Sequence, residues 1–195
     1  MGHPAHQQMD IAADLQSMVR GRFIVLTAAA AFAAAALAAF PASSAPGVRA
    51  ARIGSLEQGV LAQINVFRRS HGLAALRIST ALNRAASQHS QEMARGGYFA
   101  HESADGSSFD KRVGRFYPSS RRTFWSVGEN LVWASPDLDA SGAMQLWLNS
   151  PPHRENLLTA RWREIGISAV HVAAAPGAYG GQPVTIVTAD FGVRR

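Results

Sequence analysis

Cysteine is absent from the 195 residues of this chain. Its absence excludes disulfide bonds, thiolate metal sites and a cysteine nucleophile together. It says nothing against export, because an exported domain of this size can be held together by its hydrophobic core. Since 47% of the residues are hydrophobic, the length and composition predict one domain with a core of its own.

The sequence also lacks an internal repeat, a phosphate-cradling glycine loop and the interleaved basic and aromatic residues typical of nucleic-acid binding. We therefore expect no nucleic-acid partner. The net charge of +6 comes from scattered arginines, with one cluster at Arg112, Arg115, Arg121 and Arg122. We interpret this cluster as a solvated basic face that attracts anionic envelope polymers or lipid headgroups.

An apolar run rich in alanine, Phe23 to Phe40, follows two arginines near the N-terminus. This pattern is typical of a secretory signal, here with cleavage after Ala45. The run is also long enough to span a bilayer, so an uncleaved membrane anchor is the alternative. We divide the chain into a polar lead and signal at 1–45, a linker at 46–54 and a folded domain at 55–195. We expect a monomer that is secreted or lies in the envelope or periplasm and meets a membrane only through its N-terminal segment.

Helical spacing of apolar residues, capping residues and glycine or proline stops predict a series of helices. These helices begin at Ser55, which forms a capping box with Gln58, at Ser79, at Ser107 or Ser108, at Asp137 or Asp139, and at Ser150 with Pro151 and Pro152. The second helix carries His89 on its inner face, where a satisfied core histidine is expected. The fourth carries an apolar stripe of Ala143, Leu146 and Trp147.

Strands are expected in the second half of the chain. Residues 124–133 form a strand segment broken at Gly128, where the missing side chain indicates a bend or a close backbone approach. Residues 167–173 and 183–191 alternate and are rich in β-branched residues, so they predict two strands joined by a flexible hairpin loop, with His171 exposed on the first. This order predicts an α+β fold with helices packed on a small, mostly antiparallel sheet.

Three polar residues are candidates for a site: His101 at a helix exit, Glu129 beside Gly128, and His153 in the first turn of the last helix. A helix N-terminus favours a neutral histidine, which can accept a proton or bind a metal, although a half-buried structural histidine is the alternative at His153. Two imidazoles and a carboxylate suit either a divalent cation or general acid–base chemistry.

Four motifs occur in a fixed order: YFAHES, GENLVW, a helix that ends in WLNS, and HRENLL with a glycine thirteen residues past its histidine. Over residues 56–192 this order resembles the CAP superfamily of cysteine-rich secretory, antigen 5 and pathogenesis-related 1 proteins, in a short cysteine-free bacterial branch. The resemblance implies an α-β-α sandwich. It also implies a central cavity lined by two histidines and two glutamates, three of which match His101, Glu129 and His153.

The fourth residue of that cavity departs from the family pattern, because Ser150 stands where the second glutamate is expected. A hydroxyl cannot replace a carboxylate as an anionic ligand or a general base. A divalent cation such as zinc would then rest on His101, Glu129, His153 and water. Glu102 is a candidate for the missing carboxylate.

The resemblance implies an exported or envelope-associated binding module whose cavity holds a small apolar, lipid or envelope-derived ligand. One alternative is a hydrolase, either with a metal-bound water between His101 and His153 and Glu129 as base, or with Ser150 as nucleophile and His153 as base. The other alternative is a purely structural polar cluster.

Overall fold

We describe the fold from a computed structural model of the chain, in which residues 54–119 and 124–195 are described. The predicted signal at 1–45, nearly all of the linker, and the pair Arg121 and Arg122 lie outside these residues. Within the described part of the chain, no helix is long and apolar enough to cross a membrane.

The described residues form an ordered series of helices and strands. The α-helices are α1 (Ser55–Ser70), α2 (Thr80–Gly96), α3 (Phe109–Phe116), α4 (Ala140–Asn149) and α5 (Pro151–Leu158), with a short 3₁₀ helix η1 (Gly177–Tyr179). The strands are β1 (Arg77–Ile78), β2 (Trp125–Ala134), β3 (Glu164–Val172) and β4 (Val184–Arg194). The predicted helices and the two C-terminal strands are confirmed.

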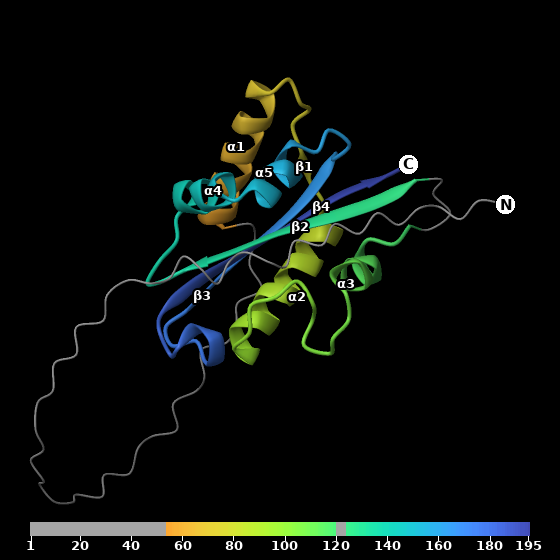
Figure 1. Ribbon diagram of the computed structural model, residues 1–195. Coiled ribbons are helices and arrows are strands. Elements are labelled where there is room, and N and C mark those ends of the chain that lie inside the picture. Colours follow the sequence, from red (N-terminus) through yellow and green to blue (C-terminus); the bar gives the residue numbers. More distant parts are fainter. Residues whose placement is uncertain (1–53, 120–123) are drawn as a thin grey trace, which may run out of the picture. The chain divides into compact units, whose positions relative to one another are not determined.

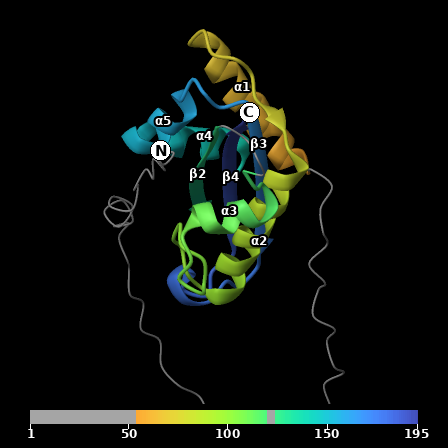
Figure 2. The ribbon, with the colours of Figure 1, turned by 90° about the vertical axis from the view of Figure 1, so that its right-hand side faces the viewer.

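The strands form one sheet in the order β1-β3-β4-β2. Only the short β1 is parallel to its neighbour β3, and the β3–β4 and β4–β2 pairs are antiparallel. Helices α1, α4 and α5 cover one face of the sheet and α2 and α3 cover the other (Figures 1 and 2). The predicted α-β-α sandwich with a mostly antiparallel sheet is therefore confirmed.

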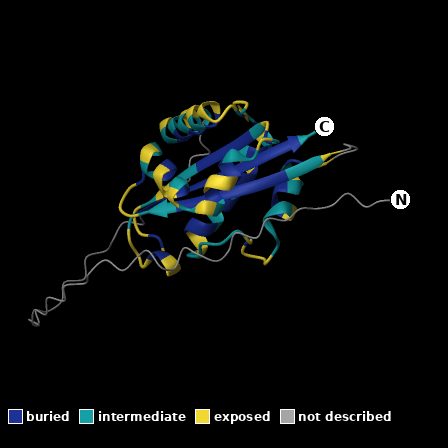
Figure 3. Ribbon diagram, turned by 45° about the horizontal axis from the view of Figure 1, so that its top comes forward, coloured by how far each residue is buried: buried dark blue, intermediate teal, exposed yellow. Residues whose placement is uncertain are grey.

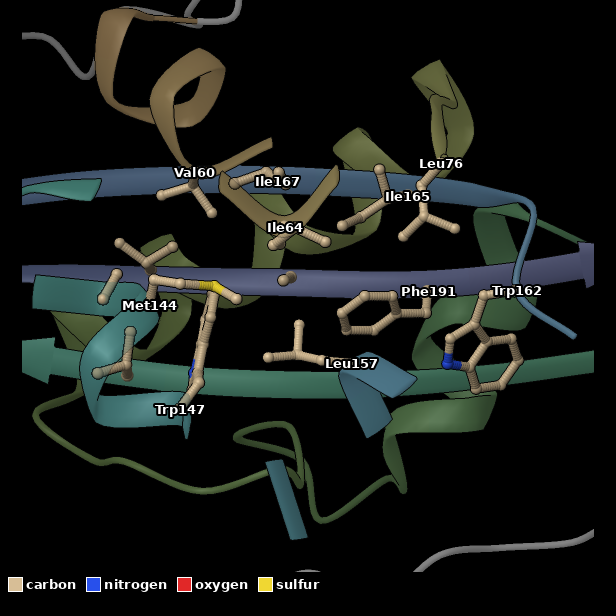
Figure 4. Close-up of a cluster of buried hydrophobic side chains, with 14 of the residues drawn as sticks. Val60, Ile64, Leu76, Met144, Trp147, Leu157, Trp162, Ile165, Ile167 and Phe191 are labelled. Carbon is tan, nitrogen blue, oxygen red and sulfur yellow. The ribbon is translucent and has the colours of Figure 1, made fainter. Parts of the chain in front are cut away.

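Both faces of the sheet are buried. On the α1, α4 and α5 face, Ile64, Trp147, Trp162 and Phe191 belong to one large apolar cluster (Figure 4). Smaller apolar clusters lie between the sheet and α2 or α3. The interior strand β4 is buried along nearly its whole length (Figure 3). Polar side chains on it therefore require partners inside the protein.

Two details of the helix ends differ from the sequence predictions. Gly54, and not Ser55, is the N-cap residue of α1, so the predicted Ser55 capping box is wrong. In α4 the N-cap is Asp139, whose carboxylate accepts a hydrogen bond from the Gly142 N–H at 2.7 Å. Leu146 is 44% exposed, so the buried stripe of this helix uses Met144 in its place.

Strand β2 runs unbroken through Gly128, so the predicted break is wrong. The alternative, a close approach, is confirmed, because a Cβ atom at Gly128 would lie 2.8 Å from atoms of Asn156 and Trp162. The loop between β3 and β4 is also more than a flexible connection. It contains η1 and the buried Tyr179, whose hydroxyl donates to the Tyr98 carbonyl at 2.8 Å.

Candidate functional site

Glu129 is the centre of a buried polar network on the α2 and α3 face of the sheet. Its side chain is 1% exposed, and its two oxygens accept hydrogen bonds from His101 Nδ1 at 2.8 Å and from the Arg112 guanidinium. Burial alone would raise the pKa of Glu129, but the His101 hydrogen bond and the Arg112 charge lower it to about 2. Glu129 is therefore an ionised carboxylate that only accepts hydrogen bonds.

Arg112 supplies the positive charge of this network from α3. Its side chain is 0% exposed, and Nη1 donates to the His101 carbonyl at 2.8 Å and to Ser103 Oγ at 3.2 Å. The interpretation of Arg112 as part of a solvated basic face is therefore wrong. This one guanidinium connects α3, the loop that carries His101, and strand β2.

A second buried carboxyl group, Asp190, lies directly across from Glu129 in the β2–β4 ladder. Asp190 is 0% exposed, and neither of its oxygens meets an N–H or O–H donor from the described residues. Burial, and then the charge of Glu129, raise the pKa of Asp190 well above its usual range. The raised pKa favours the protonated form of Asp190, whose O–H is a hydrogen-bond donor on the Glu129 side of the sheet.

Asp190 was not predicted from the sequence, although its position on β4 carries a signal. On β4, Asp190 lies on the same face of the sheet as Ile186 and Thr188, and both of these residues are buried. A carboxyl group on that face of an interior strand requires a partner. The alternation identified the strand, and the same alternation places this carboxyl group on the Glu129 side.

His89 of α2 holds the loop that leads to His101. It is fully buried, as expected of a core histidine, and its Nε2 lies 2.8 Å from the Ala100 carbonyl oxygen. Burial lowers the pKa of His89, so the ring is neutral and Nε2 carries the hydrogen donated to that carbonyl. Its Nδ1 has no hydrogen-bond partner among the described residues.

His153 lies in the first turn of α5, as predicted, and is 4% exposed. Burial, and then the charge of His101, lower its pKa to about 4, so the ring is neutral at pH 7. Its Nδ1 has no hydrogen-bond partner among the described residues. The link from His153 to β2 is made by its carbonyl oxygen, which accepts from Asn130 Nδ2 at 3.1 Å.

The GENLVW motif has a different structural role on each face of β2. Gly128 and Asn130 face α5, where Asn130 Oδ1 accepts from Asn156 Nδ2 at 2.8 Å. Glu129, between them, faces Arg112 on the opposite side. Asn156 also accepts from Trp162 Nε1 at 3.0 Å through its carbonyl oxygen. The motif therefore fixes α5 and the His101 loop to the same strand.

Ser150 and Glu102 do not join the network. Ser150 occupies the N-cap position of α5, and its side chain makes no capping hydrogen bond. No hydrogen bond joins Ser150 to His153 in the described part of the chain. Glu102 is exposed, so the prediction that it replaces the missing carboxylate is wrong. The second carboxyl group beside Glu129 is that of Asp190.

The predicted metal set can be tested against this geometry. The described residues contain no group of three or more His, Cys, Asp or Glu side chains placed to hold a metal ion. Both Glu129 oxygens already have hydrogen-bond donors, and Arg112 already balances their charge. The residues present do not fit a cation bound by His101, Glu129 and His153 together. A cation on the two histidines and water stays a prediction.

Residues 61–191 match the model of the cysteine-rich secretory protein family, CAP. The chain belongs to the CAP family. The match covers both the His101–Glu129 pair and His153, so the resemblance noted from the sequence motifs is confirmed.

Two relatives of this CAP domain come from Bacillus subtilis. The chain is 32% identical over 111 residues to the uncharacterized membrane protein YlbC, with 57% of this chain and 30% of that protein covered. It is 30% identical over 119 residues to the uncharacterized protein YkwD, and the match covers 60% of this chain and 44% of that protein. The chain therefore spans less than half the length of each relative.

Solved structures support the fold of the CAP domain. An extracellular protein with an SCP domain from Bacillus anthracis is 27% identical, with a TM-score of 0.53 and coverage of 71% of this chain and 40% of that one. An outer surface protein of Borrelia burgdorferi is 19% identical, with a TM-score of 0.58. The match covers 74% of this chain and 97% of that one. The second likeness concerns the fold alone.

Proposed function

We propose that this CAP domain is an exported, envelope-associated binding module that holds a small envelope-derived ligand at His101. The observation that carries the proposal is the difference in exposure within the network. The His101 side chain is 19% exposed, whereas Glu129 is 1% and Arg112 0% exposed. The buried residues hold one imidazole at the surface of the protein.

The hydrogen bond at Nδ1 defines what His101 offers to a ligand. Glu129 is ionised and can only accept, so Nδ1 carries the hydrogen, and in the neutral form of the ring Nε2 is an acceptor. The ring of Phe109 lies beside it, with centroids 6.3 Å apart. A hydroxyl or amide N–H attached to an apolar group matches this pair of neighbours, which fits a lipid or another envelope component.

Export is supported by two observations outside the site. The sequence carries an apolar run with a small-residue cleavage site before the domain. In addition, one similar structure, at 27% identity, is of an extracellular protein. Sequencing the N-terminus of the protein recovered outside the cytoplasm tests cleavage after Ala45, and an intact N-terminus would favour the anchor.

Ligand binding is tested on the purified protein with a total bacterial lipid extract and with solubilised peptidoglycan fragments as separate probes. We expect one probe to bind in calorimetry and His101→Gln to weaken it at least about tenfold, since a lost hydrogen bond to a charged or buried partner is worth about 1.4 kcal/mol or more. His171→Gln is the control, because His171 is an exposed histidine on β3. Absence of binding in both probes, or equal binding by His101→Gln, would contradict the proposal.

A hydrolase is the second candidate, and the His101–Glu129 pair favours one version of it. A carboxylate that orients Nδ1 leaves Nε2 as a general base toward water or a substrate hydroxyl. The geometry thus favours His101 over Glu129 as the base. Turnover of an ester or peptidoglycan substrate that is lost in both His101→Gln and Glu129→Gln would support this candidate, whereas turnover that survives both changes excludes it.

A further inference from the structure

One end of the sheet gathers exposed positive charge. We call it the basic end and define it by Arg77, Arg163, Arg194, Arg195 and Phe124. Arg77, Arg163 and Arg195 are exposed and Arg194 is half-buried. The end contains the start of β1, the residue before β3, the finish of β4 and the residue before β2.

Backbone hydrogen bonds hold these residues next to one another. The Arg77 N–H donates to the Arg163 carbonyl, and the Arg163 N–H donates to the Gly192 carbonyl, both at 3.1 Å. At the other edge, Phe124 and Arg195 exchange backbone hydrogen bonds of 3.3 and 3.0 Å. Neighbouring strands lie about 4.8 Å apart, so the four arginines fit within the footprint of a few phosphate groups.

The side chains of Arg163 and Arg194 are held in place by contacts with uncharged groups. Arg163 Nη1 donates to the carbonyls of Ala160 and Trp162 at 2.7 and 2.8 Å. The Arg194 guanidinium lies 4.0 Å over the ring of Tyr117. Stacking uses the face of a guanidinium and leaves its N–H edge available for a phosphate.

One acid, Glu164, lies at this end of the sheet, next to Arg163 and paired with Arg77 across β1 and β3. Its carboxylate accepts a hydrogen bond from the Tyr117 hydroxyl, and the four arginines outnumber it. The exposed acids Asp137 and Asp139 follow the opposite end of β2. The sheet is therefore polarised along its length, positive where β4 finishes and negative where β2 finishes.

Phe124 favours a lipid surface over a soluble phosphate polymer as the anionic partner of the basic end. It is 44% exposed, and it lies directly beside Arg195. An exposed aromatic ring adds little to the binding of a phosphate polymer in water. At a membrane interface the ring is buried among headgroups and acyl chains while the arginines meet the phosphates.

We propose that the basic end docks the folded CAP domain onto an anionic lipid surface. This contact is separate from the His101 site and from any contact of the N-terminal segment, so it stands or fails independently of the proposed ligand. Each arginine near an anionic surface strengthens binding about fivefold, so several together give measurable binding.

The test uses the full chain and vesicles of phosphatidylcholine with or without phosphatidylglycerol, in a co-sedimentation assay. The difference between the two vesicles removes the apolar contribution of the N-terminal segment. We expect R77E/R195E to lower the anionic component at least about tenfold. The charge-matched control is R95E/K111E, which changes two exposed cations on α2 and α3 and is expected to stay within about twofold.

Phe124→Ala and a soluble competitor complete the test. We expect Phe124→Ala to weaken binding several-fold, and inorganic polyphosphate to compete only in part. Equal losses in both double variants, or unchanged binding by R77E/R195E, would overturn the proposal. Full competition by polyphosphate with no effect of Phe124→Ala would also overturn it in favour of a soluble polyanion. If thermal unfolding shows that R77E/R195E is not folded, R77Q/R195Q replaces it, with an expected loss of about threefold or more.

Discussion

Arg112 determines whether two carboxyl groups can share the interior of this domain. Glu129 and Asp190 face each other across β2 and β4, and the Arg112 guanidinium is the fully buried cation bonded to Glu129. Without it, an ionised Glu129 would be desolvated with only the His101 hydrogen bond in compensation. Breaking such a buried pair from one side is far more costly than removing an exposed ion pair.

We therefore expect Arg112→Met to lower the free energy of unfolding by about 3 to 5 kcal/mol at pH 7, measured by urea denaturation. Arg115→Met is the matched control on the same helix, because Arg115 is exposed, and it should change stability by less than about 0.5 kcal/mol. Similar small losses for both variants would show that the Arg112–Glu129 pair contributes little. Combining Arg112→Met with Glu129→Gln should recover part of the loss.

Asp190 makes stability depend on pH in a direction opposite to that of an ordinary ion-paired acid. Its pKa in the folded state is raised above the unfolded value of 3.8, so folding takes up a proton once the pH exceeds about 4. The contribution of Asp190 is therefore most favourable below pH 4 and falls as the pH rises toward its folded pKa. As the pH rises above about 4, the folded protein therefore bears an increasing cost for burying this acid.

Asp190→Asn removes that cost and keeps an N–H donor for Glu129. We expect the stability of the variant relative to the wild type to increase as the pH rises from about 4 to 7. Unfolding curves across this pH range measure the difference. Glu102→Gln, which removes an exposed carboxylate, is the control and should leave the pH dependence unchanged. A difference in stability that does not change with pH would mean that folding does not raise the pKa of Asp190.

At the scale of elements, the contact between β2 and α5 depends on the absence of one side chain. A Cβ atom at Gly128 would lie 2.8 Å from Asn156 Oδ1 and from Trp162 Cζ2. Both neighbours are buried and hydrogen-bonded to each other, so they have little freedom to move away. The glycine lets α5 lie close enough for Asn156 to reach Asn130.

Gly128→Ala should therefore cost about 1 to 3 kcal/mol and raise the exposure of Trp162, detected by denaturation and tryptophan fluorescence. Gly114→Ala provides a contrasting control, since a Cβ atom at this position of α3 has no other atom within 4 Å. Because alanine favours a helix, that change should be neutral or stabilise the protein by up to about 1 kcal/mol. A neutral Gly128→Ala would mean that α5 can withdraw from β2 without loss.

The elements that are easiest to predict from the sequence are those with clear capping or helix-terminating residues. Gly97 ends α2 in a left-handed conformation, and Pro151 follows the end of α4, as predicted. Strand β1 was not predicted, because two residues cannot show a periodicity. Its place depends on β3, which is far away in the sequence.

The candidate site was predictable in part for a related reason. His101 and Glu129 were identified through family motifs, and the hydrogen bond between them supports that pairing. Arg112 and Asp190 were not identified, since their roles arise only when α3 and β4 pack against β2. The basic composition predicted a solvated Arg112 side chain, whereas the packing of α3 against β2 buries it.

At the scale of the whole molecule, the sheet is held together by β4. This strand lies between β3 and β2, and within the described residues β2 has no other strand partner. Its residues also belong to the apolar clusters on both faces, through Phe191 on one and Ile186 on the other. Loss of β4 therefore removes the centre of the sandwich and not an edge.

A chain that stops after Gln182 should consequently have no cooperative thermal transition and should bind hydrophobic dyes. Removing only Arg195 should leave the transition within a few degrees of the original, because the β4 ladder with β2 reaches Arg194. Calorimetry distinguishes the two cases. A cooperative transition in the shorter chain would show that the helices and the β1–β3 pair form a stable unit by themselves.

The central position of β4 also bears on how the protein is made. β4 comes last among the described elements, so β2 and β3 leave the ribosome before the strand that joins them exists. The growing chain cannot close its sheet during most of its synthesis. Closure of the sheet therefore waits until β4 has been made, and β2 and β3 stay without their common partner until then.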